Sequence, residues 1–294
     1  MSNVLKVPRS ISKENIFNIM LDIENCETKN PCVILDMRLL KYVDHEGLNY
    51  IALLPHYLKI LNSVVVIRLP ESDNLLSYLE YTGLLNLFFE NFTIDGFACI
   101  EDFLFLRQNK YSSGQASKAR IGIVQPDSFK KFLHNELLYV EGIISKYKFS
   151  PYFCSCFYEL TKNIFEHSGE TIGSFSFHYK TNSIYNECNE NCLLLAVSDL
   201  GIGISGSLKN TYRKNDDMDD VEYILKSMQR GVSSTGELGR GLGLPDVIES
   251  MEEVQITSGF GQVLTREGII VNERKVKSRL LGTSVSLKLN LADI

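Results

Sequence analysis

Three residues with side chains suited to phosphoryl chemistry stand four positions apart: Glu159, Asn163 and His167. Four residues advance an α-helix by slightly more than one turn, so these side chains share one stripe and can face one pocket. A carboxylate near a carboxamide suits phosphoryl transfer, because Asn163 can bind Mg2+ through its oxygen while Glu159 orients or deprotonates an attacking hydroxyl or water. His167 could contact phosphate or Mg2+-bound water, but we prefer a structural role for it at the helix end.

Three glycine-centred segments follow this helix in the chain: Asp199-Leu-Gly-Ile-Gly203, Gly239-Arg-Gly-Leu-Gly-Leu244 and Gly282-Thr283. The first ends a predicted strand, where Asp199 can accept a hydrogen bond from an adenine amino group and the glycines allow close approach. The second precedes a predicted helix over 244–251, whose free amides can hold phosphate oxygens. Each motif alone is common, but their succession within one domain indicates a nucleotide site.

The elements that must position these motifs read as an α/β domain. Helices are predicted at 129–146 and around Glu159, and strands are predicted at 121–124, 172–179, 193–197 and 285–289. The segments 262–264 and 268–272 lengthen the region before Gly282 into an apparent extra hairpin. Because a nucleotide site does not need this hairpin, it is a candidate surface for a protein partner.

The order of these motifs resembles the GHKL ATPase superfamily of gyrase, the heat-shock chaperone, histidine kinases and MutL. The resemblance covers residues 121–294 and implies a GHKL-type α/β sandwich, with a mixed sheet and helices on one face, that binds ATP and Mg2+. It implies that Glu159 is the catalytic base, that Asn163 is the Mg2+ ligand and that Asp199 reads adenine. A two-component kinase is rejected, because the nearest candidate phosphoacceptor, His134, lacks a dimerisation hairpin and the expected flanks.

The same resemblance implies the remaining cofactor-binding residues and a lid. The first glycine pair would line adenine and ribose, the second glycine segment would wrap the phosphates, and the threonine would support adenine through a water. An arginine at the end of the lid, residues 204–238, or in the second glycine segment could meet the γ-phosphate. These residues are Gly201, Gly203, Arg230, Gly239, Arg240, Gly241, Leu242, Gly243 and Thr283.

The first half of the chain has a different pattern. Nearly continuous apolar runs at 32–37 and 64–69 predict strands of a largely parallel sheet, joined by a helix over 47–61 that Pro55 should bend or shorten. A further strand is predicted at 4–7, and a helix at 74–81 that Gly83 stops. This succession predicts a second α/β domain.

These residues resemble a STAS domain, the fold of anti-sigma-factor antagonists, over residues 1–107. The resemblance rests on these segments in order: Val33-Ile-Leu-Asp36, Tyr42-Val-Asp44, Gly47-Leu48, the strand at 64–69 and Leu79-Glu-Tyr-Thr-Gly83-Leu84. Phosphorylation switches of that family carry a serine or threonine directly after the loop aspartate, where this chain has His45. The resemblance therefore implies an α/β docking or interaction module without phospho-switching.

The loop Asp44-His45-Glu46 admits two interpretations. Glu46 could supply a constant negative charge at the start of the following helix, where the helix dipole favours an anion. Alternatively, Asp44 caps that helix and His45 is simply exposed, which we prefer because capping aspartates are common.

Composition excludes several classes of protein. A formal net charge of −6 gives no general reason to bind nucleic acid, and no apolar stretch approaches the roughly 20 residues that span a bilayer. The seven cysteines lack paired C-x-x-C spacing, so we expect free thiols in the cytoplasm and no zinc. The polar segment 108–120 reads as a linker between the two domains.

Together these observations predict an Mg-ATP-binding regulatory ATPase whose lid closure controls a protein partner or the attached STAS-like domain. One alternative is a serine/threonine kinase of the anti-sigma-factor type, acting on another protein. The other is an ATP-dependent scaffold without turnover. A homodimer is compatible with each, because relatives in the superfamily often dimerise.

Overall fold

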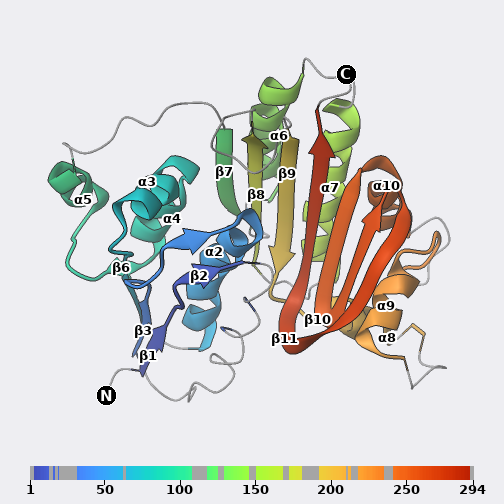
Figure 1. The fold of residues 1–294 in the computed structure, drawn as a ribbon, viewed down its shortest axis with the longest axis horizontal. Coiled ribbons are helices and arrows are strands. Elements are labelled where there is room, and N and C mark those ends of the chain that lie inside the picture. Colours follow the sequence, from blue (N-terminus) through green and yellow to red (C-terminus); the bar gives the residue numbers. More distant parts are fainter. Residues whose placement is uncertain are drawn as a thin grey trace.

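The computed structural model describes residues 3–12, 16, 19, 32–61, 64–107, 118–124, 129–145, 150–167, 172–180, 192–209, 211–212, 218–234 and 241–291. They form two α/β lobes side by side, an N-terminal lobe (residues 3–107) and a C-terminal lobe (residues 118–291) (Figure 1). The first sheet is parallel and the second antiparallel. No helix in the described ranges is long and apolar enough to cross a membrane.

The N-terminal lobe is built on four parallel strands in the order β1-β3-β5-β6. These strands are β1 (Asn3–Lys6), β3 (Cys32–Asp36), β5 (Val64–Arg68) and β6 (Thr93–Ile94). A small parallel pair, β2 (Ser10–Ile11) and β4 (Tyr42–Val43), lies beside them. The predicted strands at 4–7, 32–37 and 64–69 are therefore confirmed, and each end agrees to within one residue.

Helices α2 (His45–Leu61), α3 (Asp73–Thr82), α4 (Leu84–Asn91) and α5 (Ile100–Arg107) complete this lobe. Helix α3 begins after Ser72, whose hydroxyl accepts a hydrogen bond from Leu75 N at 3.4 Å. It ends at Gly83, which has a left-handed φ of 87°. The predicted helix over 74–81 and its stop at Gly83 are confirmed, because both signals are local.

Helix α2 is longer than the sequence predicted. It runs over 17 residues and contains Pro55, which does not shorten it. Proline removes one backbone hydrogen bond and normally breaks a helix. Here most residues on either side of Pro55 are buried, so packing on both sides of α2 offsets the missing bond.

The start of α2 settles part of the question about the loop before it. Gly47 N donates to Asp44 Oδ1 at 2.7 Å, so Asp44 caps the helix as preferred. His45 is not simply exposed, because its side chain is 19% exposed and its ring lies 6.2 Å from that of His178 in the other lobe. Glu46 is buried rather than facing solvent near the helix start.

The C-terminal lobe is built on five strands in the order β10-β11-β9-β8-β7. They are β7 (Lys118–Val124), β8 (Gly173–Lys180), β9 (Cys192–Asp199), β10 (Glu253–Arg266) and β11 (Ile269–Asn290). Every described pair is antiparallel, which differs from the mixed sheet that we expected. Strand β7 also takes in the last three residues of the expected linker, whose residues 108–117 lie outside the described ranges.

One face of this sheet is covered by helices of the same lobe (Figure 1). The helices of the lobe are α6 (Phe129–Ile144), α7 (Ser150–His167), α8 (Gly203–Lys209), α9 (Asp220–Ser227) and α10 (Gly243–Ser250). Aromatic pairs join α7 to β8: Phe157 lies 5.1 Å from Phe175 and Phe153 lies 6.0 Å from Phe177, between ring centroids. These rings are buried, and their packing sets the distance between α7 and the sheet.

The predicted extra hairpin is confirmed. Strands β10 and β11 pair across a turn at Glu267-Gly268, and β10 also folds back on itself near Gly259, where its register with β11 shifts. Gln262 Nε2 donates to Thr257 Oγ1 at 3.1 Å, and Glu267 N donates to Glu252 O at 2.8 Å. The second half of β10 thus lies beside its first half and widens the sheet.

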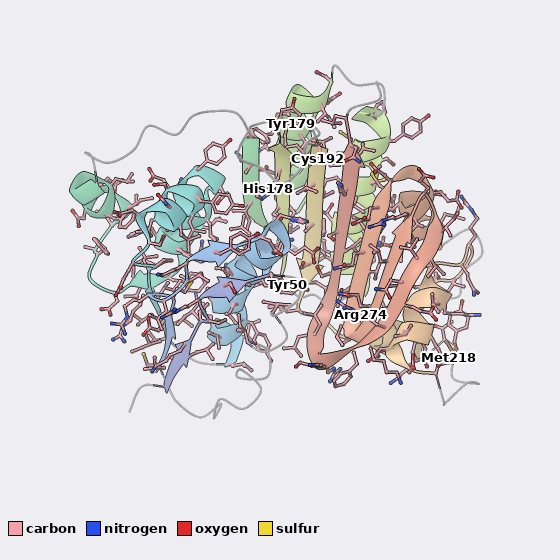
Figure 2. All side chains as sticks on the ribbon, viewed as in Figure 1. Tyr50, His178, Tyr179, Cys192, Met218 and Arg274 are labelled. Carbon is pink, nitrogen blue, oxygen red and sulfur yellow. The ribbon has the colours of Figure 1, made fainter. Side chains whose placement is uncertain are left out.

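The opposite face of the sheet is covered by α2 of the N-terminal lobe, which contacts β7, β8 and β9. Figure 2 labels Tyr50 and His178, both where the lobes meet. Glu46 accepts hydrogen bonds from Ser286 Oγ at 2.9 Å and Gln255 Nε2 at 3.3 Å. Ser176 Oγ donates to His45 O at 2.8 Å. The sheet is therefore sandwiched between its own helices and a helix from the other lobe.

Candidate functional site

A cavity of about 610 Å3 opens on the helix-covered face of the C-terminal sheet. This volume lies in the range of about 300 to 1,000 Å3 that is typical of small-molecule sites. Its walls come from α7, the last residues of β9, the adjacent middle part of β11, α8, the segment after α9 and α10. The cavity brings together these residues of the expected site: Glu159, Asn163, Asp199, Gly203, Gly241, Leu242, Gly243 and Thr283.

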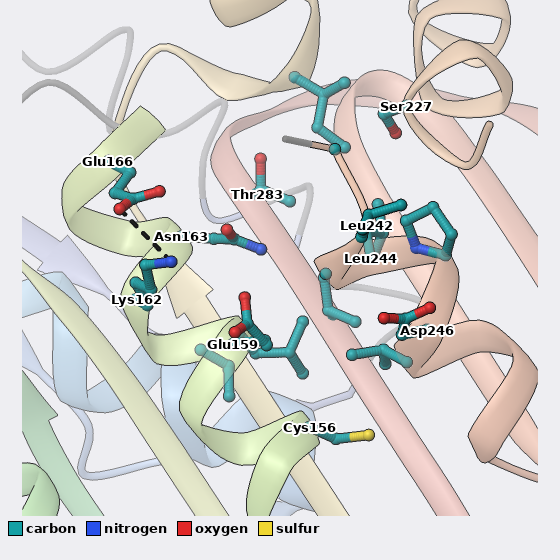
Figure 3. Close-up of a pocket in the computed structure, with 18 of the residues that line it drawn as sticks. Cys156, Glu159, Lys162, Asn163, Glu166, Ser227, Leu242, Leu244, Asp246 and Thr283 are labelled. Atoms are coloured by element: carbon teal, nitrogen blue, oxygen red, sulfur yellow. Dashed lines mark ion pairs between the residues drawn. The ribbon is translucent and has the colours of Figure 1, made fainter. Parts of the chain in front are cut away.

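Helix α7 supplies the polar wall. Its apolar stripe is buried against the sheet, so Glu159 and Asn163, one turn apart, are left half-buried on the cavity side. Figure 3 shows both side chains reaching from α7 toward Thr283 and the start of α10. At the rim, Lys162 Nζ pairs with Glu166 Oε1 at 3.6 Å. His167 is the last residue of α7, and its side chain lies outside the described ones.

Asp199 lines the cavity as the last residue of β9 and is 8% exposed. The backbone amides of Gly201 and Thr283 donate hydrogen bonds to its carboxylate, the first at 2.7 Å. Burial raises the pKa of Asp199 to about 7, although the two amides oppose this rise. A buried carboxylate in this place can accept a hydrogen bond from a ligand that donates an N–H.

Two glycines let the chain close around this carboxylate. Gly282 has a φ of 73°, and a Cβ built on it would lie 2.6 Å from Asp199 Oδ1. Gly203 also has a φ of 73°, and its Cβ would lie 2.8 Å from Ser258 Oγ. Only glycine combines this left-handed backbone with so close an approach. Steric constraints therefore explain why glycine stands at position 203 of the first segment and at position 282 of the third.

Ser258 is a residue of this site that the sequence did not suggest. Its hydroxyl accepts from Ile204 N at 2.8 Å and donates to Gly282 O at 3.0 Å, and it lies 3.2 Å from Thr283 Oγ1. Ser258 therefore ties the start of α8 to the β11 segment that carries Thr283. Only the pairing of β10 with β11 brings it there, so no local pattern marks it.

The second glycine segment is described from Gly241 onward, and Gly239 and Arg240 lie outside the described residues. Gly241 O accepts from Gly231 N at 3.0 Å, and a Cβ on Gly241 would lie 2.7 Å from Val232 N. The end of the predicted lid is thus packed on this segment.

Helix α10 starts at Gly243, and a Cβ on Gly243 would lie 2.7 Å from Glu159 Oε2. The residue before it, Leu242, makes no side-chain cap. The first amides of α10 are therefore not capped by that side chain, and they begin directly beside the α7 carboxylate.

Arg230 is not brought to the cavity. Its Nη2 lies 2.9 Å from Asp246 Oδ1 and 2.6 Å from Glu249 Oε2, and both carboxylates belong to α10 at the cavity rim. The attraction of these two carboxylates holds Arg230 in this structure, and a contact between Arg230 and a γ-phosphate stays a prediction.

Further lining residues come from the end of the predicted lid and from α7. Ser227, Val232, Ser233 and Ser234 line the cavity, and the sequence marked them only as part of the lid. Cys156 also lines it, and burial raises the pKa of its thiol to about 12, so the thiol stays neutral. The cysteines within the described residues are free.

Comparisons with known proteins do not assign this site. A scan against protein-family models finds no match to the chain, and a search of curated proteins finds none. The chemistry of the cavity therefore supplies the basis for a functional conclusion.

Proposed function

We propose that this protein binds Mg-ATP in the cavity beside α7 and hydrolyses it slowly, as a regulatory ATPase of the GHKL type. One observation carries the proposal: Glu159 and Asn163 of α7 and Asp199 of β9 line a single cavity, although they come from distant segments. The succession of motifs in the sequence suggested this grouping before any geometry was known.

The part of the cavity around Asp199 suits adenine. Asp199, when ionised, is an acceptor for the exocyclic amino group of the base, whereas guanine presents a carbonyl oxygen at that position. Thr283 lies beside it on β11, where its hydroxyl can support the base directly or through a water. The buried position of Asp199 favours selectivity, because guanine would place its carbonyl oxygen, an acceptor, against the carboxylate.

The part of the cavity beside α10 suits a triphosphate. The start of α10, where Leu242 makes no side-chain cap, offers backbone amides to phosphate oxygens. Mg2+ binds nucleotides through phosphate oxygens plus one or two protein oxygens, so Asn163 fits as its protein ligand. When bound, the cation would offset the negative charge of the triphosphate.

Glu159 is the candidate general base. Its carboxylate stands beside the first residue of α10, within the half-buried wall of the cavity, so it can orient a water near a terminal phosphate. Residues 204–238 would act as the lid, whose closure transmits nucleotide binding to a protein partner or to the N-terminal lobe.

The kinase alternative finds less support for action on the same chain. The N-terminal loop that corresponds to the phosphoacceptor loop of STAS domains has no hydroxyl at His45. In addition, Ser176 binds the His45 carbonyl on the sheet face opposite α7, so the loop faces away from Glu159. A kinase activity would therefore need a separate protein as its substrate.

Calorimetry with ATP and ADP, with and without Mg2+, together with a phosphate-release assay, tests the proposal. Glu159→Gln should keep nucleotide affinity and lower phosphate release by about 100-fold or more, as expected for loss of a general base. Glu141→Gln, on the exposed side of α6, is the matched control and should behave like the wild type. A folded wild-type protein that gives no heat with either nucleotide would refute the proposal, and binding without release would favour the scaffold.

A further inference from the structure

The two strands that carry the base-binding residues also carry the contacts between the lobes. Side chains alternate between the faces of a sheet, so a residue next to a cavity residue points away from the cavity. Ser198 precedes Asp199 on β9, and Ser284 follows Thr283 on β11. Ser198 and Ser284 are register partners, both are buried, and the Ser198 hydroxyl donates to Ser284 Oγ at 2.9 Å.

Two residues of the N-terminal lobe cover this serine pair. Asn49 is fully buried, and its Nδ2 donates to Ala196 O at 2.7 Å and lies 3.4 Å from Ser198 Oγ. The Tyr50 hydroxyl makes hydrogen bonds with Ser284 and Ser198. Figure 2 labels Tyr50 where α2 meets the sheet. A continuous hydrogen-bonded group thus joins α2 to the residues adjacent to Asp199 and Thr283.

We propose that Asn49 and Tyr50 are positioning residues for the carboxylate of Asp199, so that the N-terminal lobe sets the affinity and base selectivity of the nucleotide site. This inference rests on the proposed function, because it assigns a role to the nucleotide site described above. It makes the docked N-terminal lobe a part of the site rather than a neighbour of it.

The physical reason lies in the position of Asp199 at a strand end. Its carboxylate is held by the amides of Gly201 and Thr283, which lie next to the ends of the β9 and β11 segments that carry the serine pair. The bond from Asn49 fixes the Ala196 carbonyl, and the bonds from Tyr50 fix the adjacent serines of β9 and β11. Because the Tyr50 hydroxyl is buried, loss of these bonds would leave polar groups unsatisfied, so the arrangement has one favoured geometry.

Coupling of this kind acts in both directions. If docking of α2 favours the geometry of Asp199 that binds adenine, then bound adenine must favour docking by the same factor. Another contact between the lobes provides a comparison. Ser176, on β8, donates a hydrogen bond to the His45 carbonyl, and β8 is separated from β11 by β9. Removing that bond weakens docking without touching the serine pair.

The experiment uses the full chain and calorimetry with ADP and GDP. Tyr50→Phe and Asn49→Leu each remove hydrogen bonds at nearly constant size, and each should weaken ADP binding about fivefold while GDP binding stays the same. Ser176→Ala is the matched control and should leave the ratio of the two affinities unchanged. In hydrogen–deuterium exchange, ADP should slow exchange in residues 45–61 of the wild type and have little effect in Tyr50→Phe.

Ser284→Ala, which breaks the same group from the C-terminal side, should reproduce the effect of Tyr50→Phe if the latter folds poorly. Unchanged ADP affinity and selectivity in the variants of Tyr50, Asn49 and Ser284 would overturn the inference. An equal loss in Ser176→Ala would overturn it too, because docking in general would then be responsible. A wild type that binds no adenine nucleotide would instead refute the proposed function, which separates the two failures.

Discussion

Gly282 stands so close to Asp199 that a Cβ on Gly282 would lie 2.6 Å from the Asp199 Oδ1 atom. The two residues come from neighbouring strands, β11 and β9, whose register pairing begins just beyond them at Ser284 and Ser198. Gly282 also has a left-handed φ of 73°. The backbone of β11 therefore forms one wall of the site that holds the carboxylate.

We expect Gly282→Ala to destabilise the fold by at least about 3 kcal/mol, the sum of backbone strain and overpacking, and to abolish nucleotide binding. Gly268→Ala is the control: its φ is 76°, but a Cβ there would meet nothing within 4 Å. This variant should cost only about 1 to 2 kcal/mol from backbone strain and should keep nucleotide affinity. Urea denaturation and calorimetry measure both, and equal effects of the two variants would contradict the proposed close packing.

The raised pKa of Asp199, about 7, predicts a pH dependence of nucleotide affinity. The ionised carboxylate is the better acceptor for adenine, so affinity for ADP should rise roughly tenfold between pH 6 and pH 8. Asp199→Asn removes this titration while the phosphates of ADP still titrate. The difference between the two proteins in calorimetry across this range isolates Asp199, and parallel pH profiles would contradict the assignment.

The same pKa has a consequence for stability with the opposite sign. A carboxyl whose pKa rises from 3.8 when unfolded to about 7 when folded binds its proton more tightly in the fold. Its stabilising contribution is present below about pH 4 and is lost as the pH rises toward 7. Without nucleotide, Asp199→Asn should therefore be more stable than the wild type at pH 8. Thermal melts at pH 5 and pH 8 test this, and a wild type that equals the variant at pH 8 would contradict it.

Much of the secondary structure could be predicted from the sequence, because its signals are local. The apolar run of β9, the helical period of α7 and the cap and stop of α3 depend on residues close in the chain. The grouping of Glu159, Asn163 and Asp199 in one cavity was also predicted, from the order of motifs.

Other features depend on contacts between distant segments and left no local trace. Glu46 and Asn49 look like ordinary helix residues in the sequence, and their burial follows only from the docking of α2 on the other lobe. The ion pairs of Arg230 with α10 likewise depend on tertiary packing. The direction of strand pairing in the C-terminal sheet could not be derived either, since strand patterns do not specify partners.

The hydrogen bonds of Ser258 predict that this residue stabilises the contact between α8 and β11. Ser258→Ala would leave the amide of Ile204 and the carbonyl of Gly282 without their buried partner. We expect a loss of about 2 kcal/mol in the free energy of unfolding, together with weaker ADP binding. Ser77→Ala, whose hydroxyl donates to Asp73 O at 2.9 Å within α3, should change stability by less than about 1 kcal/mol. Denaturant titration measures both variants, and an equally small effect at Ser258 would contradict its bridging role.

The position of Arg230 predicts a difference between the affinities for ATP and ADP. If this arginine reaches the γ-phosphate when the lid closes, it must first leave Asp246 and Glu249. Glu249→Gln removes one of the carboxylates that compete with the γ-phosphate for Arg230, so it should tighten ATP binding severalfold. Arg230→Ala should weaken ATP binding and leave ADP binding unchanged.

The ion pair between Arg230 and Glu249 is exposed, so either change should alter the free energy of unfolding by less than about 1 kcal/mol. Arg266→Ala removes a similar pair with the half-buried Glu253, at 2.9 Å on the hairpin, and should change neither affinity. Calorimetry with both nucleotides measures the ratio of affinities, and a ratio that stays constant in Arg230→Ala and Glu249→Gln would show that Arg230 serves only to hold α10.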